Sequence, residues 1–242
     1  MNRMIKLLVV SFSILFLISG RAMATDITIW DGIGSLPSTG DGEKSEVEPK
    51  MIDNTNWYLE SFMLDGSSLS VTGYFDFEDG YLYNGKTYWA GDIFVAIGDV
   101  PEYGIGADSS VTNFGYDYVF DVDWDDGSYS LYELDPSGSD LSPPTSDNFP
   151  QSDPYNFNPV NETKIEDGTF SIGGDSLYTA SSFDMSFLGA NQEFWVHLTL
   201  SCGNDSMMGN GTTPVPEPAT MLLLGTGLIG LAGVGRKKLF KS

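Results

Sequence analysis

The densest set of potential metal ligands in the chain is the acidic stretch of residues 121–127, which reads DVDWDDG. Oxygen ligands at alternate positions are what a calcium-binding loop offers to one hard cation. The stretch departs from that pattern, because its glycine stands at the seventh position instead of the sixth and Tyr132 occupies the twelfth. We therefore interpret it as a solvent-exposed acidic face that ends in an Asp-Gly turn. The alternative is a calcium site formed by Asp121, Asp123 and Asp125.

Nucleophilic catalysis commonly uses a histidine as the base and can use a cysteine as the nucleophile. The chain has one of each, His197 and Cys202. A triad needs a base within hydrogen-bond reach of the nucleophile and a third group that orients the base. His197 lies inside an alternating run and Cys202 directly follows that run, so the two could meet only if the chain bent back. The many Asp and Glu residues make a glycosidase carboxylate pair available but make none distinctive. We predict that the chain is not an enzyme and binds no cofactor other than the calcium considered above.

The distribution of charge restricts the partners of this chain. Residues 25–214 hold four basic residues against 33 acidic ones, a net charge of −29, and the other seven basic residues lie near the two termini. Such a surface repels phosphate backbones and anionic lipid head groups, which excludes nucleic acid as a partner. A lone cysteine cannot form an intramolecular disulfide, so stability must come mainly from a buried core.

Strands are the elements that must position these side chains. Turn signals such as Asp-Gly and Asn-Gly recur through the body, and no 3.6-residue periodicity is present. We predict strands at residues 57–64, 69–77, 91–97, 114–124, 128–134, 169–173, 182–188 and 193–201. Residues 136–161, rich in Pro, Ser, Asp and Asn, are predicted to be a long loop.

The last predicted strand alternates clearly between apolar and polar side chains. Phe194, Val196 and Leu198 would face one way, whereas His197 and Thr199 would face the other, as in a half-buried antiparallel strand. Eight or nine such strands predict an all-β fold. We expect a two-sheet antiparallel β-sandwich, jelly-roll-like in topology, over residues 25–202, followed by a linker at residues 203–214.

Residues 1–24 are typical of a secretory signal peptide. Arg3 and Lys6 form a positive region, residues 7–18 an apolar region, and Ala22 and Ala24 a small-x-small site. This pattern predicts export and cleavage by signal peptidase after Ala24.

The C-terminal end has the features of a short transmembrane helix. Residues 219–235 are 17 consecutive residues without a charge, which is the lower limit for a helix that spans a bilayer. Glycines such as those in this run are tolerated in membranes. A basic end follows, and by the positive-inside rule it would stay on the cytoplasmic side as a stop; it consists of Arg236, Lys237, Lys238 and Lys241.

Residues 215–242 combine three parts in order: a Pro-Glu-Pro triplet, a Gly/Leu-rich span and the basic end. This arrangement resembles the PEP-CTERM sorting signal of exported bacterial proteins that are handled by exosortase, with the motif at Val215, Pro216, Glu217 and Pro218. The resemblance implies a Gram-negative host, transient residence in the inner membrane, processing near the triplet, and release to the outer surface or the extracellular matrix. A plain C-terminal anchor after a Pro-rich linker is the alternative.

Three short runs in the body, residues 91–94, 114–118 and 202–205, are similar to runs in other exosortase-dependent surface proteins, and that similarity implies no activity. We expect an exported surface or matrix protein, with a structural or adhesive body of the kind found in biofilms. One alternative is a carbohydrate-binding module for extracellular polysaccharide, because rings that could stack on sugars are plentiful, among them Trp57, Tyr58, Tyr81, Tyr83, Tyr88 and Trp89. The other is a secreted glycoside hydrolase.

Overall fold

A computed structural model describes residues 24–31, 54–99, 101, 114–135, 140–142, 154–160, 162–215 and 226. Between residues 24 and 215 the described chain forms two 3-10 helices, η1 (Thr55–Trp57) and η3 (Ser186–Leu188), and sixteen strands. The strands are β1 (Thr25–Asp26), β2 (Thr28–Asp31), β3 (Leu59–Asp65), β4 (Ser68–Gly73), β5 (Tyr81–Tyr83), β6 (Lys86–Tyr88), β7 (Ile93–Ile97), β8 (Tyr118–Asp123), β9 (Ser128–Glu133), β10 (Asp140–Ser142), β11 (Asn156–Asn158), β12 (Thr163–Thr169), β13 (Ser171–Gly173), β14 (Tyr178–Asp184), β15 (Glu193–Thr199) and β16 (Ser206–Thr212).

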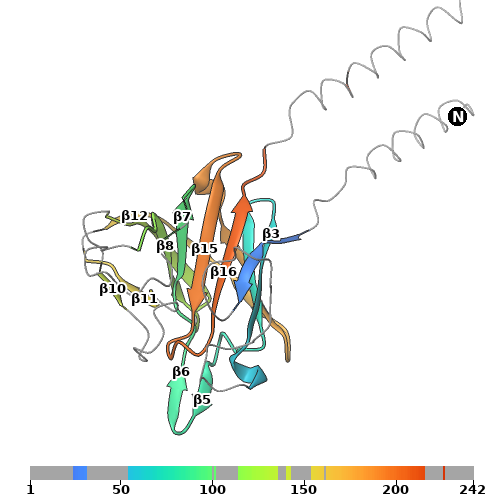
Figure 1. The fold of residues 1–242 in the computed structure, drawn as a ribbon, viewed down its shortest axis with the longest axis vertical. Coiled ribbons are helices and arrows are strands. Elements are labelled where there is room, and N and C mark those ends of the chain that lie inside the picture. The colour runs from blue at the N-terminus through green and yellow to red at the C-terminus, as the bar shows by residue number, and fades with distance from the viewer. Residues whose placement is uncertain are drawn as a thin grey trace, which may run out of the picture.

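These strands form two larger sheets and two small ones (Figure 1). The five-stranded sheet has the order β1-β3-β4-β14-β13, and the seven-stranded sheet has the order β12-β9-β8-β7-β15-β16-β2. β5 pairs with β6, and β10 pairs with β11. The described strand pairs are antiparallel throughout, which confirms the prediction of an all-β fold with antiparallel sheets. The jelly-roll topology stays a prediction.

The main hydrophobic core lies between the two larger sheets. Phe62 and Val71 enter it from the five-stranded sheet, and Val95, Leu131 and Val196 enter it from the seven-stranded sheet, each with 0% of its surface exposed. A fully buried side chain of this size stabilises the fold by about 1.5–3 kcal/mol. The core can therefore stabilise a chain whose single cysteine forms no internal disulfide.

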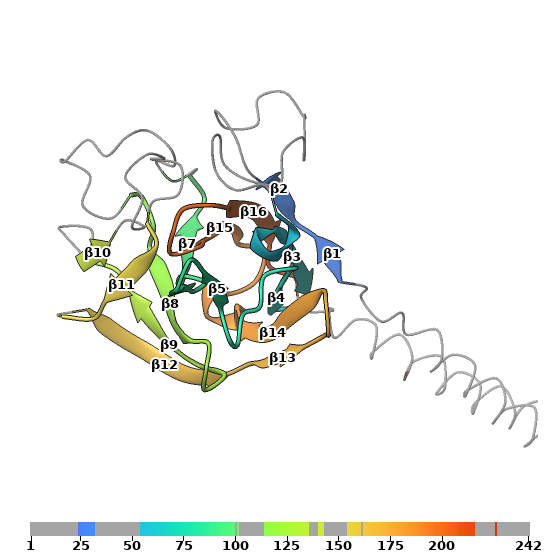
Figure 2. The ribbon, with the colours of Figure 1, turned by 90° about the horizontal axis from the view of Figure 1, so that it is seen from below.

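At two corners, consecutive strands pass directly from one larger sheet to the other. At the first corner, between β1 and β2, the Ile27 N–H donates to the Phe62 carbonyl (2.9 Å) and the Ile27 carbonyl accepts from the Asn210 N–H (2.8 Å). At the second, between β12 and β13, the Phe170 ring packs against the rings of Trp124 and Phe183. Figure 2 shows the strands arranged around a common interior, with β12 and β13 following one another across the two sheets. Such corners are how strands switch between packed sheets.

The outer face of the seven-stranded sheet is also covered. A second buried cluster lies on it, formed by Phe94, Ala96, Tyr116, Val119, Leu134 and Phe157. His197 belongs to this face and is 0% exposed, with its ring stacked on Tyr116 at 5.8 Å between centroids. The prediction of a half-buried strand with polar residues facing outward is therefore wrong for His197 and Thr199, both fully buried. The cover comes from segments distant in sequence, which alternation within one strand cannot reveal.

The structure places a strand where the sequence predicts a linker. β16 lies between β15 and β2 in the seven-stranded sheet, pairing with β15 over seven residues. Its glycines allow close packing: a Cβ on Gly209 would lie 3.0 Å from Val196 Cγ2 and 3.1 Å from both the Ile27 carbonyl oxygen and Phe62 Cδ2. The folded body therefore continues to residue 212, beyond the predicted boundary at residue 202.

Gly209→Ala should lower the free energy of unfolding by about 1–3 kcal/mol, because the added methyl group overpacks the contact between the sheets. Gly173→Ala is the matched control, since Gly173 also lies in a strand but an added Cβ there would meet nothing within 4 Å. Urea denaturation followed by tryptophan fluorescence measures both variants. Equal stability of the two variants would contradict the role given to Gly209.

Candidate functional site: a sorting segment and an acidic groove

The folded body ends just before the predicted sorting motif. The segment after β16 is fixed by hydrogen bonds: Thr213 N–H donates to the Gln192 carbonyl (2.9 Å), and Thr213 Oγ accepts from the Gln192 N–H (2.8 Å). Thr213 is buried, but two residues later Val215 is 61% exposed. The chain thus leaves the body at the first residue of the motif.

Most of the predicted export residues lie outside the described part of the chain. Of the cleavage site, Ala24 is described and exposed, whereas Ala22 is not described. Of the sorting motif only Val215 is described; Pro216, Glu217, Pro218 and the basic residues Arg236, Lys237, Lys238 and Lys241 are not. Among the residues that the structure does describe, no helix has the length and apolar character to cross a membrane.

The two ends of the body lie side by side. β2 runs antiparallel to β16, so that Thr28 near the N-terminal end of the body is paired with Gly209, three residues before the end of β16. The hydrogen bond between Ile27 and Asn210 continues this contact toward Thr25. We call this the exit end of the body. The segments before residue 24 and after residue 215 are therefore attached at the same end.

A groove of about 670 Å³ opens at the opposite end of the seven-stranded sheet. Its lining comes from the segment before β7, the end of β8, the start of β9 and the start of β11, and we call this the groove end. The residues that line it are Trp89, Ala90, Gly91, Asp92, Asp121, Val122, Asp123, Trp124, Asp125, Ser128, Tyr129, Ser130, Tyr155 and Asn156. The groove thus combines aromatic rings with carboxylate, hydroxyl and amide groups, and its volume is in the range of small-ligand sites.

Asp92 is the buried carboxylate at the base of the groove, with 2% of its surface exposed. Oδ1 accepts from the Val122 N–H (2.9 Å), and Oδ2 accepts from the Phe157 N–H (2.7 Å) and from Asn156 Nδ2 (3.0 Å). Burial raises the pKa of Asp92 to about 7, these three donors oppose the shift, and the nearby Asp121 adds to it. Asp92 therefore links β8 and β11 to the start of β7.

The three carboxylates considered for calcium all line the groove, but the structure does not assemble them into a metal site. Asp121 is half-buried, whereas Asp123 and Asp125 are exposed, and Asp123 Oδ1 accepts from the Asp126 N–H (3.1 Å) in the turn. In the described part of the chain, no group of three or more His, Cys, Asp or Glu side chains is placed to hold a metal ion. Burial raises the pKa of Asp121, while Lys164 opposes that shift and Asp123 adds to it.

His197 and Cys202 are placed where neither is activated. Burial lowers the pKa of His197 to about 3, which keeps the imidazole neutral at physiological pH. Burial also raises the pKa of the Cys202 thiol to about 11, so the thiolate required of a nucleophile is scarce near neutral pH.

The start of the run at residues 91–94 lies beside the end of β15, just before the run at residues 202–205, at the groove end. Ala90 and Leu200 form an isolated bridge, and the Gly91 N–H donates to the Thr199 carbonyl (2.9 Å). Asp205, 0% exposed, accepts from the Leu59 N–H (2.7 Å) through Oδ2 and so ties this end to the five-stranded sheet.

Sequence reasoning missed the structural roles of Asp92 and Asp205. The available signal was an acidic residue at the boundary of an apolar run, GDIFVAI in the case of Asp92. Such an acid commonly has its charge compensated by main-chain N–H groups when it is buried.

Comparison with known proteins identifies one segment of the chain. The family described as the PEP-CTERM protein-sorting motif matches residues 214–237. No curated protein and no solved structure matches the chain. The match begins where the folded body ends and includes the Pro-Glu-Pro triplet, the uncharged run and the first basic residues. Residues 214–237 therefore carry a PEP-CTERM protein-sorting motif, which confirms the sorting signal predicted from the sequence.

Proposed function

We propose that the chain is a cell-surface or extracellular-matrix protein of a Gram-negative bacterium, with a non-catalytic β-sandwich body that is structural or adhesive. The observation that carries the proposal is the sorting motif at residues 214–237, which implies export, a membrane-anchored intermediate and processing by exosortase. After processing near Pro216, Glu217 and Pro218, the body is released to the outer surface or into the extracellular polysaccharide. Signal peptidase acts at the other end, after Ala24.

The placement of the sorting segment supports this route. The segment follows an exposed residue, Val215, immediately after a strand that is hydrogen-bonded on both sides. A processing enzyme could reach the triplet without unfolding the body. The net charge of −29 over residues 25–214 would keep the body away from anionic lipid head groups once it is released.

A non-catalytic body is supported by the state of the groups that catalysis would use. Both oxygens of Asp92 already accept hydrogen bonds, from Val122, Asn156 and the buried Phe157, so this carboxyl is engaged in structure. His197 is buried and neutral, and the Cys202 thiol has a raised pKa. No observation favours a glycoside hydrolase. A carbohydrate-binding body is the second candidate, and the exposed Trp89 beside the groove favours it.

Mass spectrometry of the protein isolated from the cell surface tests the sorting route. We expect the mature chain to begin at Thr25 and to lack the residues beyond the Pro-Glu-Pro triplet. The triple variant Pro216→Ala/Glu217→Ala/Pro218→Ala should stay in the inner membrane with Ser242 intact, because the recognition site is gone. Pro214→Ala, with the same type of substitution just outside the triplet, should be processed normally. Surface-isolated wild-type protein that still ends in Ser242 would refute the route.

A further inference from the structure

The groove contains an aromatic ring that is held in place and remains accessible. Trp57 and Trp124 are buried in the core, with 1% and 5% of their surface exposed, but Trp89 is 40% exposed. The backbone of Trp89 is fixed on both sides by Ser201, whose Oγ accepts from the Trp89 N–H (3.0 Å) and whose N–H donates to the Trp89 carbonyl (2.8 Å). Its ring also packs against Gly80, where an added Cβ would lie 3.0 Å from Trp89 Cε3. Trp89 therefore offers a stacking surface to a ligand. Because the residue is already held in place, its side chain would lose little conformational entropy on binding.

The base of the groove is rigid as well. Trp124 Nε1 donates to the Gly91 carbonyl (3.0 Å), and the Asp92 N–H donates to the Tyr155 carbonyl (3.0 Å). A Cβ on Gly91 would collide with the backbone and ring of Tyr155, so only glycine allows this approach. Together with the three hydrogen bonds of the Asp92 carboxylate, these contacts preform the groove in the absence of a ligand.

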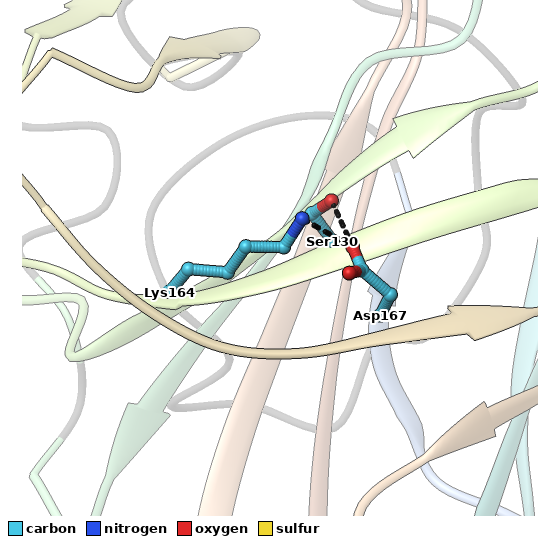
Figure 3. A network of polar contacts seen from close by, with 3 residues as sticks. All are labelled: Ser130, Lys164 and Asp167. Atoms are coloured by element: carbon cyan, nitrogen blue, oxygen red, sulfur yellow. Dashed lines mark hydrogen bonds and ion pairs between the residues drawn. The ribbon is translucent and has the colours of Figure 1, made fainter.

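The charge of the groove limits the ligand to one class. Among the described residues, its lining includes four aspartates and no lysine, arginine or histidine. Lys164 is close to Asp121 and comes from β12, which is separated from β8 by β9. Lys164 is already paired with Asp167, which also accepts from Ser130 Oγ at 2.7 Å (Figure 3). An anionic ligand would be repelled both here and by the body as a whole. Hydroxyl and ammonium groups, in contrast, would find carboxylate acceptors beside the indole ring.

The groove is also at the right end of the molecule to meet a ligand outside the cell. Thr199 pairs with Ser206 at the groove end of the β15–β16 pair, and Glu193 pairs with Thr212 at the exit end. Seven residues of strand place these ends about 20 Å apart. In Figure 1, β6, which directly precedes Trp89, lies at the bottom of the body, and β16 ends at the top. While the sorting segment holds the exit end at the membrane, the groove faces away from it.

We propose that this groove is a binding site for a saccharide chain that carries free amino groups. One sugar ring stacks on Trp89, and ammonium and hydroxyl groups of the chain interact with Asp121, Asp123 and Asp125. The outward orientation of the site rests on the proposed sorting function, but the binding itself does not depend on it.

Calorimetric titration of the full-length chain in detergent micelles tests the proposal. The probes are a β-1,4-linked glucosamine hexamer, the fully N-acetylated hexamer of the same linkage, and an oligogalacturonate of the same length. We expect the glucosamine hexamer to bind, the neutral hexamer to bind at least about tenfold more weakly, and the anionic one not to bind. Added salt should weaken binding of the glucosamine hexamer, because exposed charges are screened.

Two groups of variants locate the site. Trp89→Ala should weaken binding about tenfold or more, since an aromatic anchor dominates a small interface. The pair Asp123→Asn/Asp125→Asn should weaken it about threefold to tenfold and keep the turn, because asparagine Oδ1 can also accept from the Asp126 N–H. The pair Asp65→Asn/Glu193→Gln removes the same charge at the exit end and should leave the affinity unchanged.

Three results would overturn the proposal. The first is no binding of the glucosamine hexamer at low salt, and the second is equal binding of the acetylated hexamer. The third is an equal loss of affinity in the groove pair and the exit-end pair, which would show attraction by overall charge alone. None of these results would affect the mass-spectrometric test of sorting, so the two proposals can fail separately.

Discussion

Replacing Asp92 with alanine should lower the free energy of unfolding by about 3–5 kcal/mol. The substitution removes the acceptor of three hydrogen bonds, from Val122 N–H, Phe157 N–H and Asn156 Nδ2, at a residue that is 2% exposed. In the folded variant, these donors would have neither water nor a protein acceptor as a partner to the extent that they are buried, and this destabilises the folded state. Chemical denaturation followed by tryptophan fluorescence measures the loss.

Asp117→Ala provides the matched control for this prediction. Asp117 also accepts a main-chain hydrogen bond, from the Ile97 N–H at 2.7 Å, but Asp117 is exposed. Water can replace the lost acceptor there, so we expect a change of about 1 kcal/mol or less. Finding that Asp92→Ala costs no more than Asp117→Ala would show that Asp92 does not hold the groove end together.

Stability should depend on pH through two buried groups that act in opposite directions. The pKa of Asp92 is raised to about 7, so between pH 4 and 7 the folded chain keeps a proton that the unfolded chain has lost, and stability falls as the pH rises. The pKa of His197 is lowered to about 3, so between pH 6.5 and 3 the unfolded chain holds a proton that the folded chain lacks. This contribution is fully present above pH 6.5 and is lost as the pH falls.

Single variants should separate the two contributions. Because one pKa unit corresponds to about 1.4 kcal/mol, each contribution is on the order of 4 kcal/mol, and in the wild type they largely cancel between pH 4 and 6.5. His197→Leu should leave a chain that loses stability as the pH rises across this range. Asp92→Asn should leave one that loses stability as the pH falls. The free energy of unfolding at pH 4, 5, 6 and 7 measures both slopes, and two variants with slopes of the same sign would contradict the assignment.

Local pattern was sufficient to predict eight of the sixteen described strands, but it did not reveal what packs on them. The run from Phe194 to Leu200 alternates as a strand should, and β15 forms there. Its outer face is buried by a cluster that includes Tyr116 and Phe157. These two residues lie 81 and 40 residues away in sequence from His197. The sequence of β15 alone therefore does not indicate that its outer face is buried.

Glycine and polar residues caused further errors in the predicted fold. The predicted loop at residues 136–161, rich in Pro, Ser, Asp and Asn, contains the paired strands β10 and β11. The glycines of β16 resemble linker residues in composition, yet Gly209 serves close contact between the sheets. β12 was also missed, because it is an edge strand with six exposed residues out of seven, which gives it no apolar face. Its charged pair of Lys164 and Asp167 and its bulge between Lys164 and Glu166 are typical of protected edges.

The sorting motif at residues 214–237 could be predicted from sequence, because its information is linear: a triplet, an apolar run and a basic end. The groove could not, because it exists only where residues 89–92, 121–130 and 155–156 meet. The sequence offered Trp89 among six candidate rings, and the structure shows that it is the one of the six that lines the groove and that it is exposed. Asp121, Asp123 and Asp125 were selected for a metal, but the structure places them along the lining of the groove.

The register of β16 has a mechanical consequence. A protein held by its C-terminal segment while it grips a polymer at the other end is under tension along the direction of this strand. The load then acts parallel to β16, which is bonded to β15 on one side and to β2 on the other. Its hydrogen bonds are loaded in shear and must break together, whereas a strand pulled from its edge would open one bond at a time. Under the two proposals above, the pairing of β16 on both sides would resist force applied between the C-terminal segment and the groove end.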